Sequence, residues 1–142
     1  MTVLDTNVIS EMMKKKPAPA VVAWLDAQPE DAIWTTAVSV FEIRFGLNVL
    51  PNGKRKHNLQ ELFETMIRRD FGGRVMDFDS TAAEQSALIA AKSQGIGRPV
   101  EIRDVMIAGI VAARGATLAT RNTKHFGLTG IPLIDPWQSG AG

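Results

Sequence analysis

The chain has 142 residues, with no cysteine and only two histidines, His57 and His125. The lack of cysteine excludes disulfides, thiolate nucleophiles and cysteine-bound zinc or iron–sulfur centres. Neither histidine has a partner at the spacing of a zinc site. The sequence also lacks the Gly-x-Ser-x-Gly pattern of serine hydrolases and a glycine-rich phosphate loop. These absences exclude most familiar hydrolytic mechanisms.

Long uncharged apolar runs are also missing, since none approaches the ~18 residues that a membrane-spanning helix needs. The first residues, MTVLDTN, have neither a basic leader nor a long apolar stretch. We therefore expect a soluble, cytoplasmic protein with no membrane partner. Hydrophobic residues make up 45% of the chain, enough for one folded domain. We expect this domain to cover residues 1–138 and residues 139–142 to form a flexible tail.

Positive and negative side chains nearly balance, and the net charge is +1. This balance alone implies no nucleic-acid partner, but the basic residues gather in three clusters: Lys14 to Lys16, Lys54 to Lys56, and Arg68 with Arg69. Solvated helix ends would explain each cluster separately. Clusters that converged on an acidic cleft would instead attract a polyanion.

Strand-like and helix-like segments alternate along the chain. Strands are expected at 2–4, 32–36, 74–78, 117–120 and 132–134. Helices are expected at 6–15, 20–27, 38–50, 56–70, 80–94 and 102–113, the first with Thr6 as its N-cap. Strands separated by helices form parallel sheets covered on both faces. The sequence therefore predicts a three-layer α/β/α sandwich with a central, mostly parallel sheet.

Glu42 is the acid that stands out most in this pattern. On a helix over 38–50 it falls in the middle of a face formed by Val38, Phe41, Phe45 and Val49, which we predict to be buried. A carboxylate there is costly unless a positive or hydrogen-bonding group meets it. Glu42 is therefore expected to have a partner outside its own helix, and a metal ion is one candidate.

Three more polar residues stand at related positions. Asp5 and Asn122 follow predicted strands, and Asp104 lies in an otherwise apolar helix. Helix-start acids and a turn asparagine would explain each one singly. Ligands of parallel sheets bind at the carboxyl ends of the strands, so these residues should converge with Glu42. Three clustered carboxylates need protons or a divalent cation, and oxygen ligands suit Mg²⁺ or Mn²⁺.

The ordered motifs resemble those of a PIN domain over essentially the whole chain. They are Asp5-Thr6-Asn7-Val8-Ile9-Ser10, Ser39-Val40-Phe41-Glu42-Ile43, Asp104-Val105-Met106-Ile107-Ala108 and Thr120-Arg121-Asn122-Thr123. Trp24-Leu25-Asp26 and Pro136-Trp137 are similar to the FitB-like branch of VapC toxins. The resemblance implies a catalytic set of Asp5, Glu42, Asp104 and Asn122, in which the three acids hold the metal. Thr6, Asn7 and Thr120 would support it. Many members carry an acid where this chain has Asn122.

The resemblance further implies the toxin of a type II toxin–antitoxin pair. Such a toxin is a metal-dependent endoribonuclease that cuts a structured RNA such as tRNA and leaves a 5′-phosphate. A small antitoxin of the VapB or FitA type would block the cleft and supply operator-DNA binding. A homodimer is expected, with Trp24, Trp34 or the Phe41-to-Leu50 surface as contact. The alternatives are a PIN nuclease of RNA processing and a weakly catalytic regulatory partner.

Overall fold

The computed structural model describes residues 1–138, so the predicted tail at 139–142 lies outside the described residues. Its five strands form one parallel sheet in the order β3-β2-β1-β4-β5. The strands are β1 (Thr2–Leu4), β2 (Ile33–Thr36), β3 (Val75–Met76), β4 (Thr117–Ala119) and β5 (Leu133–Ile134). The prediction of a central parallel sheet is confirmed, and β1 is its middle strand.

Helices connect all the strands. They are α1 (Thr6–Met12), α2 (Pro19–Asp26), α3 (Ala37–Asn48), α4 (Lys54–Thr65), α5 (Ser80–Gly95), α6 (Ile102–Arg114) and α7 (Thr123–Phe126). Short 3-10 segments occur at Glu30–Ala32 and Gly127–Thr129, and a π-helical turn at Met66–Asp70 follows α4. Over residues 1–138, none of the helices combines the length and apolar character needed to cross a membrane.

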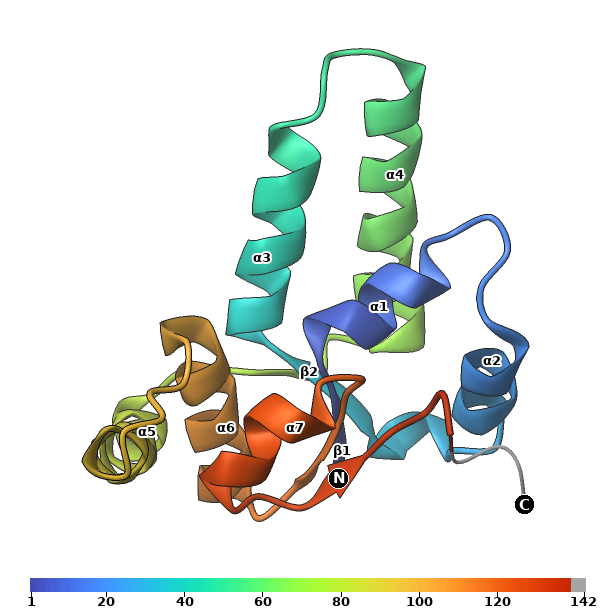
Figure 1. Ribbon diagram of the computed structural model, residues 1–142. Helices are drawn as coiled ribbons and strands as arrows, with labels where there is room; N and C mark the ends of the chain where they lie inside the picture. The colour runs from blue at the N-terminus through green and yellow to red at the C-terminus, as the bar shows by residue number, and fades with distance from the viewer. Residues whose placement is uncertain (139–142) are drawn as a thin grey trace.

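The side chains of the central strands alternate between two cores, as a strand requires. Val3 and Leu118 face a core formed with α5 and α6, whereas Leu4 and Ala119 face a core formed with α1 to α4. Figure 1 shows these two groups of helices on opposite sides of the strands. The predicted three-layer α/β/α sandwich is therefore confirmed.

The helix pair α5 and α6 packs very closely. A Cβ added at Gly109 would lie 1.8 Å from the Ser86 hydroxyl and 2.6 Å from the Ala82 carbonyl, so only glycine fits there. The Ser86 hydroxyl also donates to the Val105 carbonyl of α6 at 3.0 Å. This contact fixes the position of α6, whose first turn carries Asp104.

Helices α3 and α4 form a hairpin that projects away from the sheet (Figure 1). The predicted buried face of α3 is wrong. Val38 is buried, but Phe41, Phe45 and Val49 are more than half exposed, at 59%, 57% and 65%. The core contacts come instead from the face of Ser39, Ile43 and Leu47. Because α3 is apolar on two faces, the apolar pattern alone does not show which face packs against the core.

Several local predictions also need correction. Asp5, not Thr6, caps α1, because its side chain accepts a hydrogen bond from the Thr6 amide. The predicted helix over 56–70 changes to a π turn at Met66. Asn122, for which a turn was one explanation, directly precedes a short helix, α7. Trp24, one of the residues proposed for an exposed dimer contact, is only 8% exposed and packs in the core.

Candidate active site

Asp5 lies at the carboxyl end of the middle strand and is only 4% exposed. Its amide donates to the Ala119 carbonyl at 2.9 Å, which fixes it to β4. Its Oδ1 accepts from the Thr6 amide at 2.8 Å, and its Oδ2 accepts from the Thr120 hydroxyl at 2.8 Å. Burial raises the pKa of Asp5 to about 6, although both hydrogen bonds favour the ionised form. The nearby Asp104 and Glu42 charges raise it slightly further.

Asn7 and Thr120 surround the second oxygen of Asp5. The Asn7 side-chain amide donates to Asp5 Oδ2 and to Thr120 Oγ1, both at 3.3 Å. Thr120 is fully buried, and its hydroxyl accepts from the Asn122 amide at 3.0 Å. Asn7 Oδ1 accepts from the Arg121 amide at 3.3 Å. These bonds orient the Asp5 carboxylate and tie α1 to the turn after β4.

Glu42 has the partners outside its own helix that the sequence predicted. The Thr6 hydroxyl lies 3.1 Å from Glu42 Oε1 and 2.9 Å from the Ser39 hydroxyl. The Arg103 guanidinium of α6 lies 3.9 Å from Glu42 Oε2. The side chain of Glu42 is 22% exposed, so it stands at the edge of the cleft rather than in the core.

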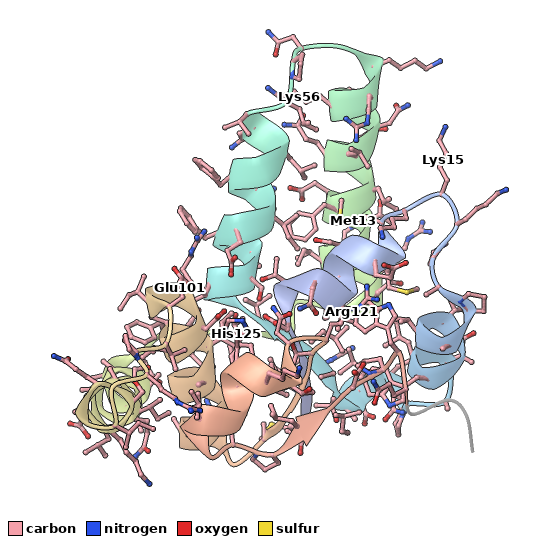
Figure 2. All side chains as sticks on the ribbon, in the orientation of Figure 1. Met13, Lys15, Lys56, Glu101, Arg121 and His125 are labelled. Carbon is pink, nitrogen blue, oxygen red and sulfur yellow. The ribbon has the colours of Figure 1, made fainter. Side chains whose placement is uncertain are left out.

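Asp104 enters the cleft from the first turn of α6 and is half-buried. Burial raises its pKa, and the negative charges of Glu101 and Glu42 add to this shift. Positive charge at His125 and Arg103 acts in the opposite direction. Figure 2 shows Glu101 beside α6 and His125 on α7. Over residues 1–138, the Asp104 carboxylate accepts no side-chain hydrogen bond and forms no ion pair, so its oxygens are free for a ligand.

Asn122 stands at the start of α7, exposed at the edge of the same cleft. The Asn122 side chain does not cap the helix, and the Asn122 backbone amide donates to the Thr120 hydroxyl. The structure therefore brings Asp5, Glu42, Asp104 and Asn122 to one cleft, as predicted. The cleft has a volume of about 440 Å³ and also contains Thr6 and Asn7.

The donors of this cleft fit a hard divalent cation. The acids supply only oxygen atoms, and Asp5 is an unusually buried carboxylate with a raised pKa. Within residues 1–138, no three His, Cys, Asp or Glu side chains stand close enough to bind one ion together. The arrangement therefore suits an ion held directly by one or two carboxylates and otherwise by water, as Mg²⁺ commonly is.

Residues that the sequence did not single out also belong to the site. Ser39 is fully buried, and its hydroxyl lies between those of Thr36 and Thr6. The sign of this role in the sequence is a serine placed one helical turn before Glu42. Arg103 and Glu11 line or border the cleft as well, and only their three-dimensional contacts reveal them.

A second, larger groove of about 890 Å³ joins the cleft along α1 and the α3–α4 hairpin. Thr6, Ser10, Lys14 and Glu42 line both. Apolar side chains of Met13, Ile43, Leu47 and Leu59 lie along the groove, and Lys14, Lys15, Lys54 and Arg55 line it as well. Two of the three basic clusters thus meet here. Figure 2 shows Lys15 in the loop after α1 and Lys56 near the tip of the α3–α4 hairpin. The third lies elsewhere, with Arg69 in a separate pocket.

Comparison with known proteins gives consistent results. The family model "PIN domain" matches residues 2–129. The chain is 40% identical to the VapC ribonuclease Y4jK of Sinorhizobium fredii, over 97% of this chain and 99% of that one. It is 36% identical to the toxin FitB of Neisseria gonorrhoeae, with the same shares. It is 30% identical to the tRNA(fMet)-specific endonuclease VapC of Shigella flexneri, over 95% and 96%.

Among solved structures, FitAB bound to an IR36 DNA fragment superimposes with a TM-score of 0.90 at 36% identity. The match covers 97% of this chain and 96% of the other. Sequence and fold agree, and the chain belongs to the PIN-domain family, in the group of VapC- and FitB-type toxins.

Proposed function

We propose that this protein is the toxin of a type II toxin–antitoxin pair, a divalent-metal-dependent endoribonuclease neutralised by a small antitoxin. The observation that carries the proposal is the convergence of Asp5, Glu42 and Asp104 in one open cleft beyond the carboxyl ends of β1, β2 and β4. The names of the related VapC ribonuclease and tRNA(fMet)-specific endonuclease support RNA as the substrate.

Each acid has a distinct part in the proposed reaction. Asp5 and Asp104 would hold Mg²⁺ or Mn²⁺ directly, and Glu42 would bind the ion through a water molecule or accept a proton from the attacking water. Such an ion would supply a water of lowered pKa and positive charge beside the phosphate. Thr120 and Asn7 keep the Asp5 carboxylate in position, and Thr6 does the same for Glu42. Asn122 orients water at the edge of the cleft.

A structured RNA, such as tRNA, is the proposed substrate, cut to leave a 5′-phosphate. The basic walls of the groove support this proposal, because they surround a path that ends at Glu42. Cationic side chains along such a path attract phosphates toward an acidic centre that would otherwise repel them.

A small antitoxin of the VapB or FitA type is the proposed protein partner. The groove beside α1 supports this, because an apolar segment seated on Ile43, Leu47 and Leu59 would close the path to the cleft. The related FitAB structure contains DNA. We therefore propose that this chain meets operator DNA only through its antitoxin, and that regulation of transcription accompanies the nuclease activity.

A homodimer is the proposed assembly, built on the exposed apolar face of α3. Phe41, Phe45 and Val49 form this face, and the two rings stack with centroids 6.1 Å apart. Such a patch on a projecting hairpin favours a contact with a second copy.

The first test is cleavage of end-labelled tRNA by antitoxin-free protein in Mg²⁺, in Mn²⁺ and in EDTA. We expect discrete, metal-dependent cuts that Asp5→Asn reduces by about 100-fold or more, because it removes a metal-binding charge. Asp77→Asn changes an exposed aspartate outside the cleft and is the matched control. Circular dichroism checks that both variants are folded. Cleavage that persists in EDTA or in Asp5→Asn would contradict the proposal.

A further inference from the structure

Arg121 and Trp137 form a stacked pair in the wall of the acidic cleft. The guanidinium carbon of Arg121 lies 4.9 Å from the centre of the Trp137 ring. Both residues line the cleft that contains Asp5 and Asp104. Figure 2 shows Arg121 just below α1. The groove between α1 and the hairpin is lined by other residues, so the pair marks a different approach to the acids.

The backbone holds both members of the pair in place. The Arg121 amide donates to Asn7 Oδ1, and the preceding residue, Thr120, donates its amide to the Ile134 carbonyl at 2.9 Å. The Trp137 amide donates to Asp135 Oδ1 at 2.9 Å. The turn after β4 and the segment after β5 therefore carry the pair as fixed parts of the sheet edge.

The guanidinium of Arg121 stands apart from the ion pairs of the described residues. The positive charge of Arg121 is the smallest of the influences that lower the pKa of the buried Glu11, and this carboxylate is already bonded to the Lys14 ammonium and the Ala18 amide. Arg121 is exposed, and stacking occupies one face of its guanidinium while leaving the N–H edges free. An arginine held in this way is prepared for an anion with planar, bidentate acceptors.

We propose that Arg121 binds a phosphate of the RNA strand next to the bond that is cut, and that Trp137 is a positioning residue that holds its guanidinium. This inference rests on the proposed ribonuclease function. The scissile phosphate must approach Asp5 and Asp104, so a neighbouring phosphate of the same strand reaches the cleft wall, where Arg121 lies. Without the Trp137 ring, Arg121 keeps its positive charge, but its guanidinium is no longer held in one orientation.

The test compares Arg121→Gln, Trp137→Leu and Trp137→Phe in cleavage of a short RNA hairpin. We expect Arg121→Gln to raise KM about 10-fold with kcat within about twofold, since a charged hydrogen bond to bound substrate is lost. Trp137→Leu should raise KM less, and Trp137→Phe should restore it because a ring remains. Arg68→Gln changes an exposed arginine that lines neither the cleft nor the groove, and is the matched control.

A second readout is independent of cleavage. Binding of fluorescein-labelled hairpin is measured in an Asp104→Asn background at several salt concentrations. Loss of one phosphate contact should reduce the slope of log K against log salt by about 0.7 for a single strand.

Unchanged KM and slope in Arg121→Gln would overturn the inference, as would a loss confined to kcat or to antitoxin binding. Absence of metal-dependent cleavage in the wild type would count against the proposed function, whereas the binding slope would still decide the role of Arg121.

Discussion

Asp5 is a carboxylate that the fold both orients and deprives of water. Three groups donate to it: the Thr6 amide, the Thr120 hydroxyl and the Asn7 amide. Its burial nevertheless raises its pKa to about 6. The hydrogen bonds fix the direction of the oxygens but do not compensate for the lost hydration. A divalent cation would supply that missing stabilisation, which links the structure of this residue to the proposed chemistry.

Metal binding at Asp5 should therefore stabilise the folded protein. We expect saturating Mg²⁺ to raise the Tm of the wild type by roughly 5–10 °C when its concentration is about 100 times Kd. Asp104→Asn should lose most of this increase, while Asp77→Asn should keep it. Differential scanning fluorimetry in Mg²⁺ and EDTA measures the effect. An equal increase in Asp104→Asn would show that the ion binds elsewhere.

Asp5 and Asn122 could be predicted from the sequence because their positions just after strands are local information, whereas Glu42 and Asp104 stood out as acids in apolar helices, Glu42 on a face that proved to be the wrong one. Asp5 directly follows β1, and Asn122 comes soon after β4, so parallel pairing brings them to one edge. The resemblance implied the support by Thr6, Asn7 and Thr120, but the sequence did not predict the parts of Ser39 and Trp137. Ser39 lies beside Thr6 only because α3 has a particular rotation, and Trp137 reaches Arg121 only through the turn after β5.

At the scale of elements, α1 and the loop that follows it carry much of the groove. Glu11 is buried at the end of α1 and accepts from the Lys14 ammonium and the Ala18 amide, both at 2.9 Å. It thereby closes the loop that leads to α2 and brings Lys14 to the groove wall. The bond to Lys14, followed by that to Ala18, lowers the pKa of Glu11.

Because the pKa of Glu11 is lower in the folded state, its ionised form contributes stability above the ordinary value of 4.5. That contribution is lost as the pH falls through the lowered folded-state pKa. We expect Glu11→Gln to lower the Tm at pH 7 and the difference from wild type to shrink below pH 4.5. Thermal melts from pH 3 to 7 measure it, with the exposed Glu84→Gln as control. A constant difference across this range would contradict the role of the charge.

The prediction of the wrong buried face for α3 has a physical cause. The helix has apolar residues on the face of Ile43 and Leu47 and again on the face of Phe41 and Phe45. Periodicity shows that both faces exist but not which one meets the sheet. The sheet selects the face with the small Ser39, which lets α3 approach α1 and places Glu42 beside Thr6.

At the scale of the whole molecule, the functional surfaces are separated. The acidic cleft opens at the carboxyl edge of the sheet, and the basic, apolar groove runs from it along the hairpin. The exposed rings of Phe41 and Phe45 do not line this groove. A second copy of the chain could therefore bind on α3 without competing with substrate or antitoxin, which share the groove.

The exposed face of α3 predicts the solution mass. Antitoxin-free protein should have twice the mass of the 15.4 kDa chain in light scattering, because pairing two such faces buries their rings. Phe45→Glu should shift the mass to that of the monomer, since dimerisation would bury an unpaired charge. Leu88→Glu, which alters a similarly exposed apolar residue on α5, should leave it unchanged. A monomeric wild type, or dissociation by Leu88→Glu alone, would refute the α3 interface. Retained metal-dependent cleavage by a monomeric Phe45→Glu variant would further show that each cleft is complete within one chain.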